Sequence, residues 1–239
     1  MCTLEQRGRV FVLTLTGDGE HRLGHSLIGS IRAAVSSVAA AAAPGAALVT
    51  VAEGRFFSNG LDIGPGGIPP ARVGELVEAL RPLAADLLAL PMPTVAAVTG
   101  HASAAGFLLA LCHDYRLMRA DRGVLYMSEI DIGLPLPPYF VAILRAKITA
   151  AHALRDVTLR GKKLKAAEAK EMEIVDVVCP TAAETAAEAV KLAQQLAERK
   201  WNGSVYSSIR ICMFPEACRS VGIVEESDEE KRNHFASKL

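Results

Sequence analysis

The sequence lacks an excess of charge of either sign, a long uninterrupted apolar run, and any cysteine pair with metal-ligand spacing. Its 239 residues contain 26 Lys and Arg against 26 Asp and Glu, which argues against a general nucleic-acid binder because such proteins carry a basic excess. The longest apolar stretch, residues 35–51, is interrupted by serine, proline, glycine and threonine, so no segment has the length of a transmembrane helix. The five cysteines are scattered, which predicts reduced thiols in an intracellular compartment and excludes a disulfide framework or a zinc site.

Familiar signatures of nucleotide, metal and serine-nucleophile sites are incomplete as well. The glycine-rich segments 17–19 and 64–67 complete neither a GxGxxG pattern nor a phosphate-binding P-loop. His21 and His25 are four residues apart, but no glutamate follows His21 and the segment is not clearly helical. A polar loop is therefore favoured there over a metal site. Ser103 lacks the GxSxG pattern of a nucleophile elbow, so a serine hydrolase is not supported.

The sequence does contain alternating strand and helix patterns. Short apolar or alternating runs predict strands at residues 10–16, 46–52, 94–98, 115–118 and 124–126. Apolar positions at helical spacing predict helices over residues 27–38, 73–87 (bent near Pro82), 104–111 and 182–199, within a last third that is mostly helical. This alternation is typical of the α/β class with interior parallel strands. We expect a core over residues 1–180 and a helical region over 181–239 that covers the active site or forms subunit contacts.

Two junctions between predicted elements are rich in small residues. The first spans residues 55–62 and the second spans residues 98–107. Small side chains let a ligand approach the backbone closely, so that free N–H groups can face an oxygen atom. Two such donors, one of them at the start of a helix, would form an oxyanion hole. Taken singly, each junction also fits an ordinary tight turn.

These junctions carry a resemblance to a known family. The segment FSNGLD (residues 57–62), then AVTGHASAAGFLLAL (97–111) and HDYRLMRADRGVLYMSEIDIGLPLP (113–137), resembles the enoyl-CoA hydratase/isomerase, or crotonase, superfamily. The resemblance implies a spiral of repeated ββα units with a helical C-terminal part. It also implies homotrimers or hexamers built from trimers, an acyl-CoA thioester as substrate, and neither a metal nor a separate cofactor, since coenzyme A is part of the substrate.

The resemblance also implies an oxyanion hole made by the backbone. The thioester carbonyl would lie between the N–H groups of Leu61 and Ala105. Backbone donors have no side-chain signature, so a shift of one residue would move these roles to Gly60 or Gly106. Each such donor typically lowers the barrier by about 3 kcal/mol.

Four further residues of the first junction acquire an expected role in the same way. Arg55, Ser58 and Asn59 would lie near the adenine and pantetheine portions of coenzyme A. Asp62 would support the loop instead of reacting. The basic residues of the last third are not assigned to the phosphates of coenzyme A, because such residues usually form a solvated helix face.

The acidic residues decide which reaction the resemblance implies. Hydratases of the family use two glutamates, one to activate water and one to deliver a proton. The first position falls on Leu108, which has no proton to exchange, and the second falls on Glu129. A single base facing an oxyanion hole suits a double-bond shift, as in the Δ3,Δ2-enoyl-CoA isomerases of unsaturated fatty-acid β-oxidation. By itself Glu129 also fits a surface or salt-bridged glutamate, and Asp131 is the nearest alternative acid.

Ser237, Lys238 and Leu239 form the tripeptide that acts as a peroxisomal address, which predicts recognition by the import receptor and a location in the peroxisome. Two alternatives to the isomerase stay open. One acid and one oxyanion hole also suit another crotonase-type reaction, such as hydrolysis or decarboxylation of an acyl-CoA. The other alternative is a catalytically silent subunit that binds CoA esters, although the presence of Glu129 counts against it.

Overall fold

A six-stranded sheet forms the centre of the molecule. The computed structural model describes residues 1–239 except residues 65, 68 and 225–239. The strands lie in the order β1 (Cys2–Arg7), β2 (Val10–Leu15), β3 (Ala47–Ala52), β5 (Thr94–Val98), β7 (Tyr115–Arg119) and β10 (Val177–Cys179). Only the β1–β2 pair is antiparallel, and the other pairs are parallel. The interior strands are almost wholly buried, as their apolar sequences require.

A second, smaller sheet lies beside the first. It contains β4 (Phe56–Ser58), β6 (His101–Ser103), β8 (Val124–Tyr126) and β9 (Leu164–Lys165) in that order. The pairs β4–β6 and β6–β8 are parallel, whereas β9 is antiparallel to β8. The carboxyl ends of β4, β6 and β8 therefore meet at one edge of this sheet. The two small-residue junctions and Glu129 follow these three ends.

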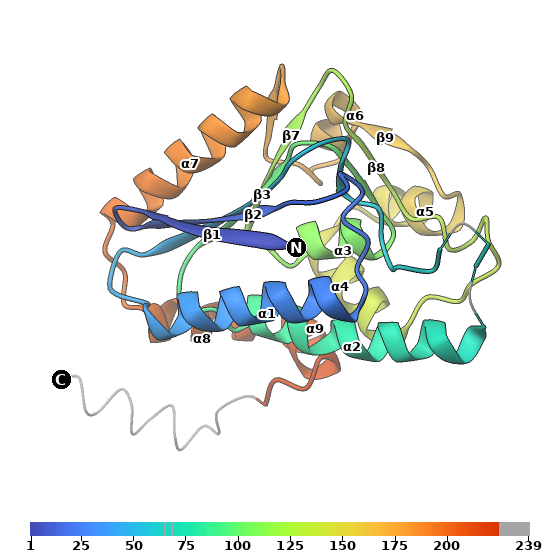
Figure 1. The fold of residues 1–239 in the computed structure, drawn as a ribbon, viewed down its shortest axis with the longest axis horizontal. Coiled ribbons are helices and arrows are strands. Elements are labelled where there is room, and N and C mark those ends of the chain that lie inside the picture. The colour runs from blue at the N-terminus through green and yellow to red at the C-terminus, as the bar shows by residue number, and fades with distance from the viewer. Residues whose placement is uncertain (65, 68, 225–239) are drawn as a thin grey trace.

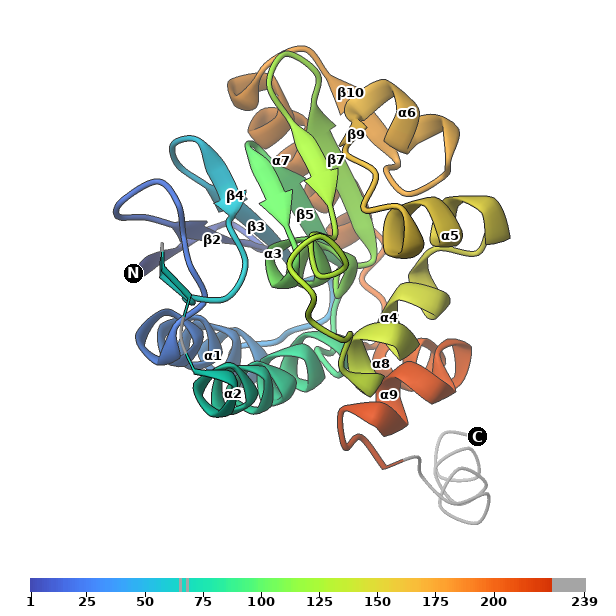
Figure 2. The same cartoon turned by 90° about the vertical axis from the view of Figure 1, so that its right-hand side faces the viewer.

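Helices cover both faces of the central sheet. In chain order they are α1 (His25–Ala40), α2 (Pro70–Leu88), α3 (Ala105–Leu111), α4 (Pro138–Lys147), α5 (Ala151–Leu159), α6 (Ala166–Glu171), α7 (Ala182–Glu198), α8 (Gly203–Met213) and α9 (Pro215–Ser220). Helices α1 and α2 run side by side below the strands in Figure 1, and α7 crosses above them. Figure 2 shows α3 and α4 enclosed between the sheets and the helices α8 and α9. The main hydrophobic core lies between the central sheet and the helices α1, α2, α3 and α4.

Helix α7 lies in the region expected to begin at residue 181, and it packs on the outer face of the central sheet. Ala189, Ala193 and Ala197 recur every four residues and form a second cluster with Val49 and Val95. Small alanine side chains allow this close contact between helix and sheet. The division of the chain at residue 180 stays a prediction. The Ser-Lys-Leu tripeptide at residues 237–239 lies outside the described residues.

The structure confirms the α/β class and most of the expected elements. The strands at 94–98 and 124–126 have the expected bounds, and the helices expected at 104–111 and 182–199 each differ by one residue at one end. Helix α2 continues through Pro82. The last third is mostly helical, as expected, although the short strands β9 and β10 also lie there. β9 has two residues and β10 has three.

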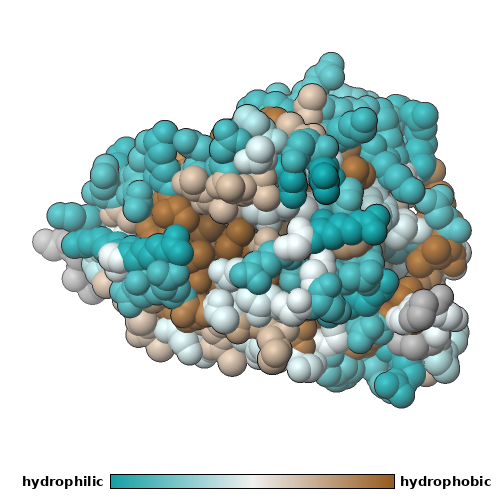
Figure 3. Space-filling view, turned by 45° about the horizontal axis from the view of Figure 1, so that its top comes forward, coloured by the Kyte–Doolittle hydropathy of each residue, from teal (hydrophilic) through white to brown (hydrophobic). Residues whose placement is uncertain are grey.

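Polar side chains cover most of the face seen in Figure 3, with hydrophobic residues gathered in separate patches. Within the described residues, no helix combines the length and the apolar character needed to cross a membrane.

Candidate active site

The two small-residue junctions are packed directly against each other. A Cβ atom on Gly106 would lie 2.2 Å from the carbonyl oxygen of Ser58, so only glycine fits at this contact. A Cβ atom on Gly60 would lie 3.1 Å from the carbonyl oxygen of Ser103, and Gly60 also has a φ of +77°. The hydroxyl of Ser103 donates to the side-chain oxygen of Asn59 at 3.1 Å. The small residues therefore let the two loops approach each other.

The orientation of the Leu61 N–H follows from the peptide that precedes it. The carbonyl oxygen of Gly60 accepts a hydrogen bond from the N–H of Leu23 at 2.7 Å. The described residues contain no cis peptide, and in a trans peptide the C=O and N–H groups point in opposite directions. The N–H of Leu61 therefore points away from Leu23. No hydrogen bond between described residues uses this N–H as donor.

The N–H of Ala105 is free for a similar reason. Ala105 is the first residue of α3, and the preceding carbonyl, that of Ala104, accepts from the N–H of Leu108 at 3.0 Å. The Ala105 N–H thus points out of the start of the helix. Ala104 has a φ of 49° and a ψ of −122°, a conformation that is uncommon for a residue with a side chain. Within the described chain no acceptor is bonded to the Ala105 N–H.

Glu129 follows β8, the strand next to the one that leads into α3. The N–H of Ala104 donates to the carbonyl of Tyr126 at 2.8 Å, which ties the start of α3 to the end of β8. Glu129 is 8% exposed, and its Oε2 is buried with no hydrogen-bond partner among the described residues. Burial raises the pKa of its carboxyl, although hydrogen bonds from its own N–H and that of Ser128 act in the opposite direction. One carboxylate oxygen is thus available to accept a proton.

The other two acid positions considered from the sequence lie in different surroundings. Leu108 is 1% exposed and belongs to the main core, so no acidic group occupies its position. Asp131 is exposed, whereas Glu129 is buried. Among the described residues, no group of three or more His, Cys, Asp or Glu side chains is arranged to hold a metal ion.

Two of the residues expected near coenzyme A face different ways. The Arg55 side chain is exposed, and its guanidinium lies 5.3 Å from the centre of the Phe56 ring. Ser58 is fully buried, and its hydroxyl donates to the carbonyl of His21 at 2.8 Å. The Ser58 hydroxyl therefore belongs to the internal structure of the loop, while Arg55 is accessible to a ligand.

Asn59 and Asp62 lie on either side of the Gly60–Leu61 peptide. Asn59 is half-buried and is joined to the second junction through Ser103. Asp62 is exposed, and its N–H donates to the carbonyl of Leu23 at 3.3 Å. This position fits the expected supporting role, because the N–H of Leu23 donates to Gly60 and the carbonyl of Leu23 accepts from Asp62, on either side of Leu61. The individual roles of these residues stay predictions.

Sequence reasoning missed His21 as a component of this region. The polar loop expected there contains an imidazole that is 2% exposed and contacts the Phe56–Gly60 segment. Nothing local in the sequence indicates that His21 is buried beside a segment 35 residues away.

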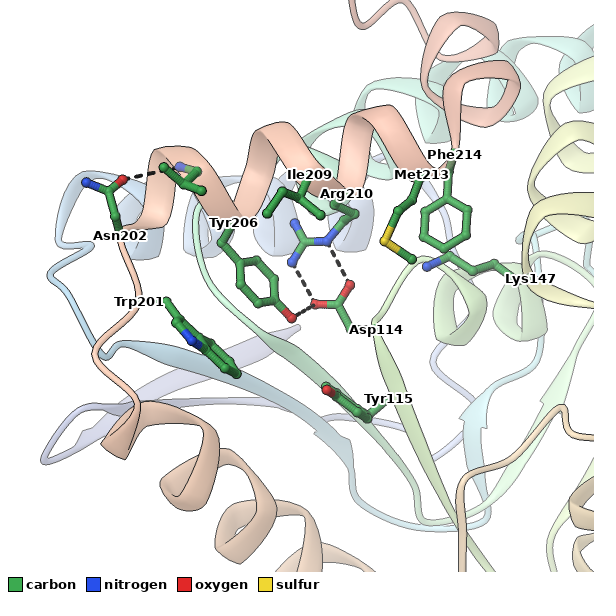
Figure 4. A pocket seen from close by; sticks show the side chains of 11 residues that line it. Asp114, Tyr115, Lys147, Trp201, Asn202, Tyr206, Ile209, Arg210, Met213 and Phe214 are labelled. Carbon is green, nitrogen blue, oxygen red and sulfur yellow. Dashed lines mark hydrogen bonds and ion pairs between the residues drawn. The ribbon is translucent and has the colours of Figure 1, made fainter. Parts of the chain in front are cut away.

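A separate cavity of about 520 Å³ lies between the amino-terminal end of β7 and helix α8 (Figure 4). The side chain of Arg210, on α8, spans its wall and makes two hydrogen bonds with the carboxylate of Asp114, at 2.7 and 2.6 Å. Burial opposes ionisation of Asp114, but Arg210, together with Lys147 and the N–H of Thr94, outweighs this effect, so the pKa of Asp114 is lowered. Trp201, Ile209 and Met213 contribute apolar surface to the same cavity. Asp114 and Arg210 bond each other, and most of the remaining lining of the cavity is apolar.

Comparisons with known proteins point in one direction. A sequence profile of the family described as enoyl-CoA hydratase/isomerase matches residues 23–206. "Enoyl-CoA delta isomerase 3" of Arabidopsis thaliana is 48% identical over 93% of this chain and 96% of its own length. "Enoyl-CoA delta isomerase 2, peroxisomal" of the same plant is 47% identical with the same coverage. Both relatives align along nearly their whole length.

Solved structures share the fold at lower sequence identity. An enoyl-CoA hydratase of Mycobacterium marinum has a TM-score of 0.81 and 21% identity, covering 92% of this chain and 94% of that one. A structure described as an Mtb enoyl-CoA isomerase has a TM-score of 0.83, also at 21% identity, and covers 100% of this chain and 98% of that one. The chain therefore has the fold of these proteins, as expected from its motifs.

Proposed function

Because this chain belongs to the enoyl-CoA hydratase/isomerase family, we propose that it converts 3-enoyl-CoA to trans-2-enoyl-CoA. The observation that carries the proposal is the environment of Glu129, whose buried Oε2 has no partner among the described residues. Glu129 follows β8, and β8 pairs with β6, the strand that leads to the free N–H of Ala105. The names of the Arabidopsis relatives support the same reaction.

In the proposed mechanism Glu129 moves one proton between two carbon atoms. Its carboxylate removes a proton from C2 of the 3-enoyl thioester, and the electron pair moves onto the carbonyl oxygen. The N–H groups of Leu61 and Ala105 donate to the resulting dienolate oxygen. The electron pair then returns, the double bond forms between C2 and C3, and the carboxylic acid delivers the same proton to C4. Atoms and charge balance without a metal or an added cofactor.

The surroundings of Glu129 favour this transfer over hydration. A raised pKa makes the carboxylate a stronger base for an α-proton than an exposed glutamate would be. Leu108 provides no second acid to position water, and its buried leucine side chain offers water no hydrogen-bonding group. We infer that hydration of 2-enoyl-CoA by this protein is slower than isomerisation by orders of magnitude.

The test uses the purified full chain and 3-enoyl-CoA with a chelator present and no added metal, nucleotide or flavin. Formation of the conjugated thioester is followed by its ultraviolet absorbance, and coupling to a hydratase and a dehydrogenase confirms the product. Rapid isomerisation with slow hydration is expected. Hydration faster than isomerisation would favour another reaction of the superfamily. Tight acyl-CoA binding without turnover of any thioester would favour a silent binding subunit.

We also propose that the protein forms trimers, alone or as pairs of trimers, through α8. Val205, Ile209 and Met213 are spaced four residues apart on this helix, and Ile209 and Met213 are 55% and 64% exposed. Together with Trp201 they form the apolar side of the cavity in Figure 4, which a second subunit would cover. Light scattering should give three or six times 25.3 kDa, and Ile209→Glu should shift the mass toward that of the monomer. A 25.3 kDa wild type at micromolar concentration would refute the assembly.

A peroxisomal location is proposed on separate grounds. Two Arabidopsis relatives, 47% and 46% identical, are named peroxisomal, whereas the relative at 48% has no location in its name. The tripeptide at residues 237–239 is the address expected from the sequence, and the import receptor is its proposed partner. A fluorescent fusion that keeps this tripeptide at its free carboxyl end should be punctate. Deleting the tripeptide should leave the fusion in the cytosol, and unchanged puncta would refute this address.

A further inference from the structure

His21 occupies an unusual backbone conformation beside the first junction. Its φ of 48° lies in the left-handed region, which few residues with a side chain adopt. The carboxylate of Asp18 supports this turn by accepting hydrogen bonds from the N–H groups of Glu20 at 2.9 Å and His21 at 3.1 Å. The conformation places the imidazole in the interior, where 2% of the residue is exposed. Such a conformation costs on the order of 1–3 kcal/mol, which the surrounding contacts must offset.

The imidazole makes a single hydrogen bond among the described residues. Its Nδ1 lies 2.9 Å from the carbonyl oxygen of Phe56. A carbonyl oxygen only accepts, so Nδ1 is the donor in this bond. Nε2 is buried with no hydrogen-bond partner in the described chain. An apolar side chain would fill the same space without burying an unpaired nitrogen, so the bond to Phe56 is what distinguishes histidine at this position.

The backbone of His21 controls the same segment through a relay. Its carbonyl oxygen accepts from the Ser58 hydroxyl at 2.8 Å, and the oxygen of that hydroxyl accepts from the N–H of Gly60 at 3.3 Å. The carbonyl of Gly60 in turn accepts from Leu23, two residues after His21. Gly60 is thus held at both its N–H and its C=O by the segment that contains His21. The orientation of the next N–H, that of Leu61, follows from these bonds.

We propose that His21 is a positioning residue that aims the Leu61 N–H at the carbonyl oxygen of the acyl-CoA thioester. This inference rests on the proposed function, because it assigns the aimed N–H to the oxyanion hole. His21 contacts neither the substrate nor the reacting atoms. Its imidazole bonds the carbonyl of Phe56, and this bond anchors the turn whose backbone carbonyl accepts from the Ser58 hydroxyl. Loss of the side chain removes that anchor and therefore affects polarisation of the thioester more than affinity for coenzyme A.

The experiment compares His21→Ala with His21→Asn in the full-length protein. Asparagine tolerates a positive φ and carries an amide N–H near the position of Nδ1, so it preserves both features of His21. The control is His113→Ala, because His113 is also buried and its Nδ1 also donates to a backbone carbonyl, that of Leu109 at 2.9 Å, although its Nε2 additionally bonds the Thr50 hydroxyl at 2.8 Å. It follows the carboxyl end of α3, away from the Leu61 peptide. Ser58→Ala removes the relay without changing the imidazole.

Two readouts separate positioning from stability. The first is kcat and KM for 3-enoyl-CoA, normalised to folded protein. The second is the absorbance of a bound conjugated dienoyl-CoA, whose band moves to longer wavelength when its carbonyl oxygen accepts strong hydrogen bonds. This shift needs binding but no turnover. It therefore tests His21 even if the proposed reaction is wrong, whereas absence of isomerisation by the wild type refutes only the reaction.

His21→Ala should lower kcat by about 10–100-fold, part of the 10²–10³-fold loss typical when a whole oxyanion donor is removed, with KM within about threefold. It should also reduce the spectral shift, and His21→Asn should restore most of both. Ser58→Ala should reduce the shift in the same direction, and it provides the test if His21→Ala does not fold. His113→Ala should lower stability and leave the shift unchanged. An unchanged shift in His21→Ala and Ser58→Ala, or an equal loss in His113→Ala, would overturn the proposal.

Discussion

Replacing Glu129 with glutamine removes a buried charge while keeping the size of the side chain. The amide cannot accept the C2 proton, so kcat should fall by at least the roughly 10²–10⁴-fold that general-base catalysis contributes. Binding of a saturated acyl-CoA should be retained, because the proposed contacts to the thioester oxygen come from backbone groups. In the wild type, log kcat/KM should rise with pH through the raised pKa of Glu129 and then level off.

Although Glu129→Gln should lower activity, it should raise the free energy of unfolding. Burial raises the pKa of Glu129, so the folded state binds this proton more tightly than the unfolded state does. The free energy of unfolding therefore falls as pH rises from the ordinary carboxylate value of 4.5 through the raised pKa, and the loss persists above it. Glu129→Gln avoids this loss. Its expected gain at pH 8 is about 1 kcal/mol, the lower end of the range for an unsatisfied buried polar group.

Urea unfolding at pH 8 and pH 4, together with the isomerase assay, tests both effects. A gain of about 1 kcal/mol corresponds to roughly 2–4 °C in Tm for a chain of this size. The stability difference should shrink at pH 4. Asp131→Asn is the matched control, because it removes the same charge two residues away from an exposed position and should change neither quantity much. Near-normal activity in Glu129→Gln, or a loss of stability at pH 8, would refute this account of the site.

Two other substitutions test the packing around the site and the cavity. Gly106→Ala would force a Cβ atom to within 2.2 Å of the Ser58 carbonyl oxygen, so it should lower both activity and Tm. Its control is Gly74→Ala, which lies in open space on α2 and should raise the free energy of unfolding by about 0.5–1 kcal/mol. Equal Tm changes in the two variants would contradict this reasoning. Arg210→Met leaves the Asp114 carboxylate buried without its cation and should lower the free energy of unfolding by about 3–5 kcal/mol. Arg210→Lys should restore little of this free energy of unfolding, because lysine lacks the planar guanidinium that bonds Asp114 twice. If urea unfolding showed that Arg210→Met is as stable as the wild type, the pair would have no structural role.

The elements that the sequence determined are those with a long or strongly apolar pattern. Strand β5 is a short continuous apolar run, and the alanine-rich helix α7 has a helical period; the local sequence alone reveals both. Strands β4, β6 and β9 have two or three residues and were not expected from the sequence, whereas β8, which is equally short, was expected at residues 124–126. Strand β1 is longer, but its residues are mostly exposed and show no buried face. Hydrogen bonding to β2, which its own side-chain pattern does not reveal, makes this segment a strand.

The sequence by itself also determined the composition of the candidate site, through the two small-residue junctions and the position of Glu129. The tertiary structure decided how these parts meet, because the contacts join residues far apart in the chain. Gly106 fits against Ser58, and the hydroxyl of Ser58 reaches His21, 37 residues away. The direction of the Leu61 N–H and the absence of a partner for Glu129 Oε2 among the described residues depend on neighbours from other segments. Local patterns report which face of an element is apolar, whereas burial and hydrogen-bond direction exist only once the segments have packed together.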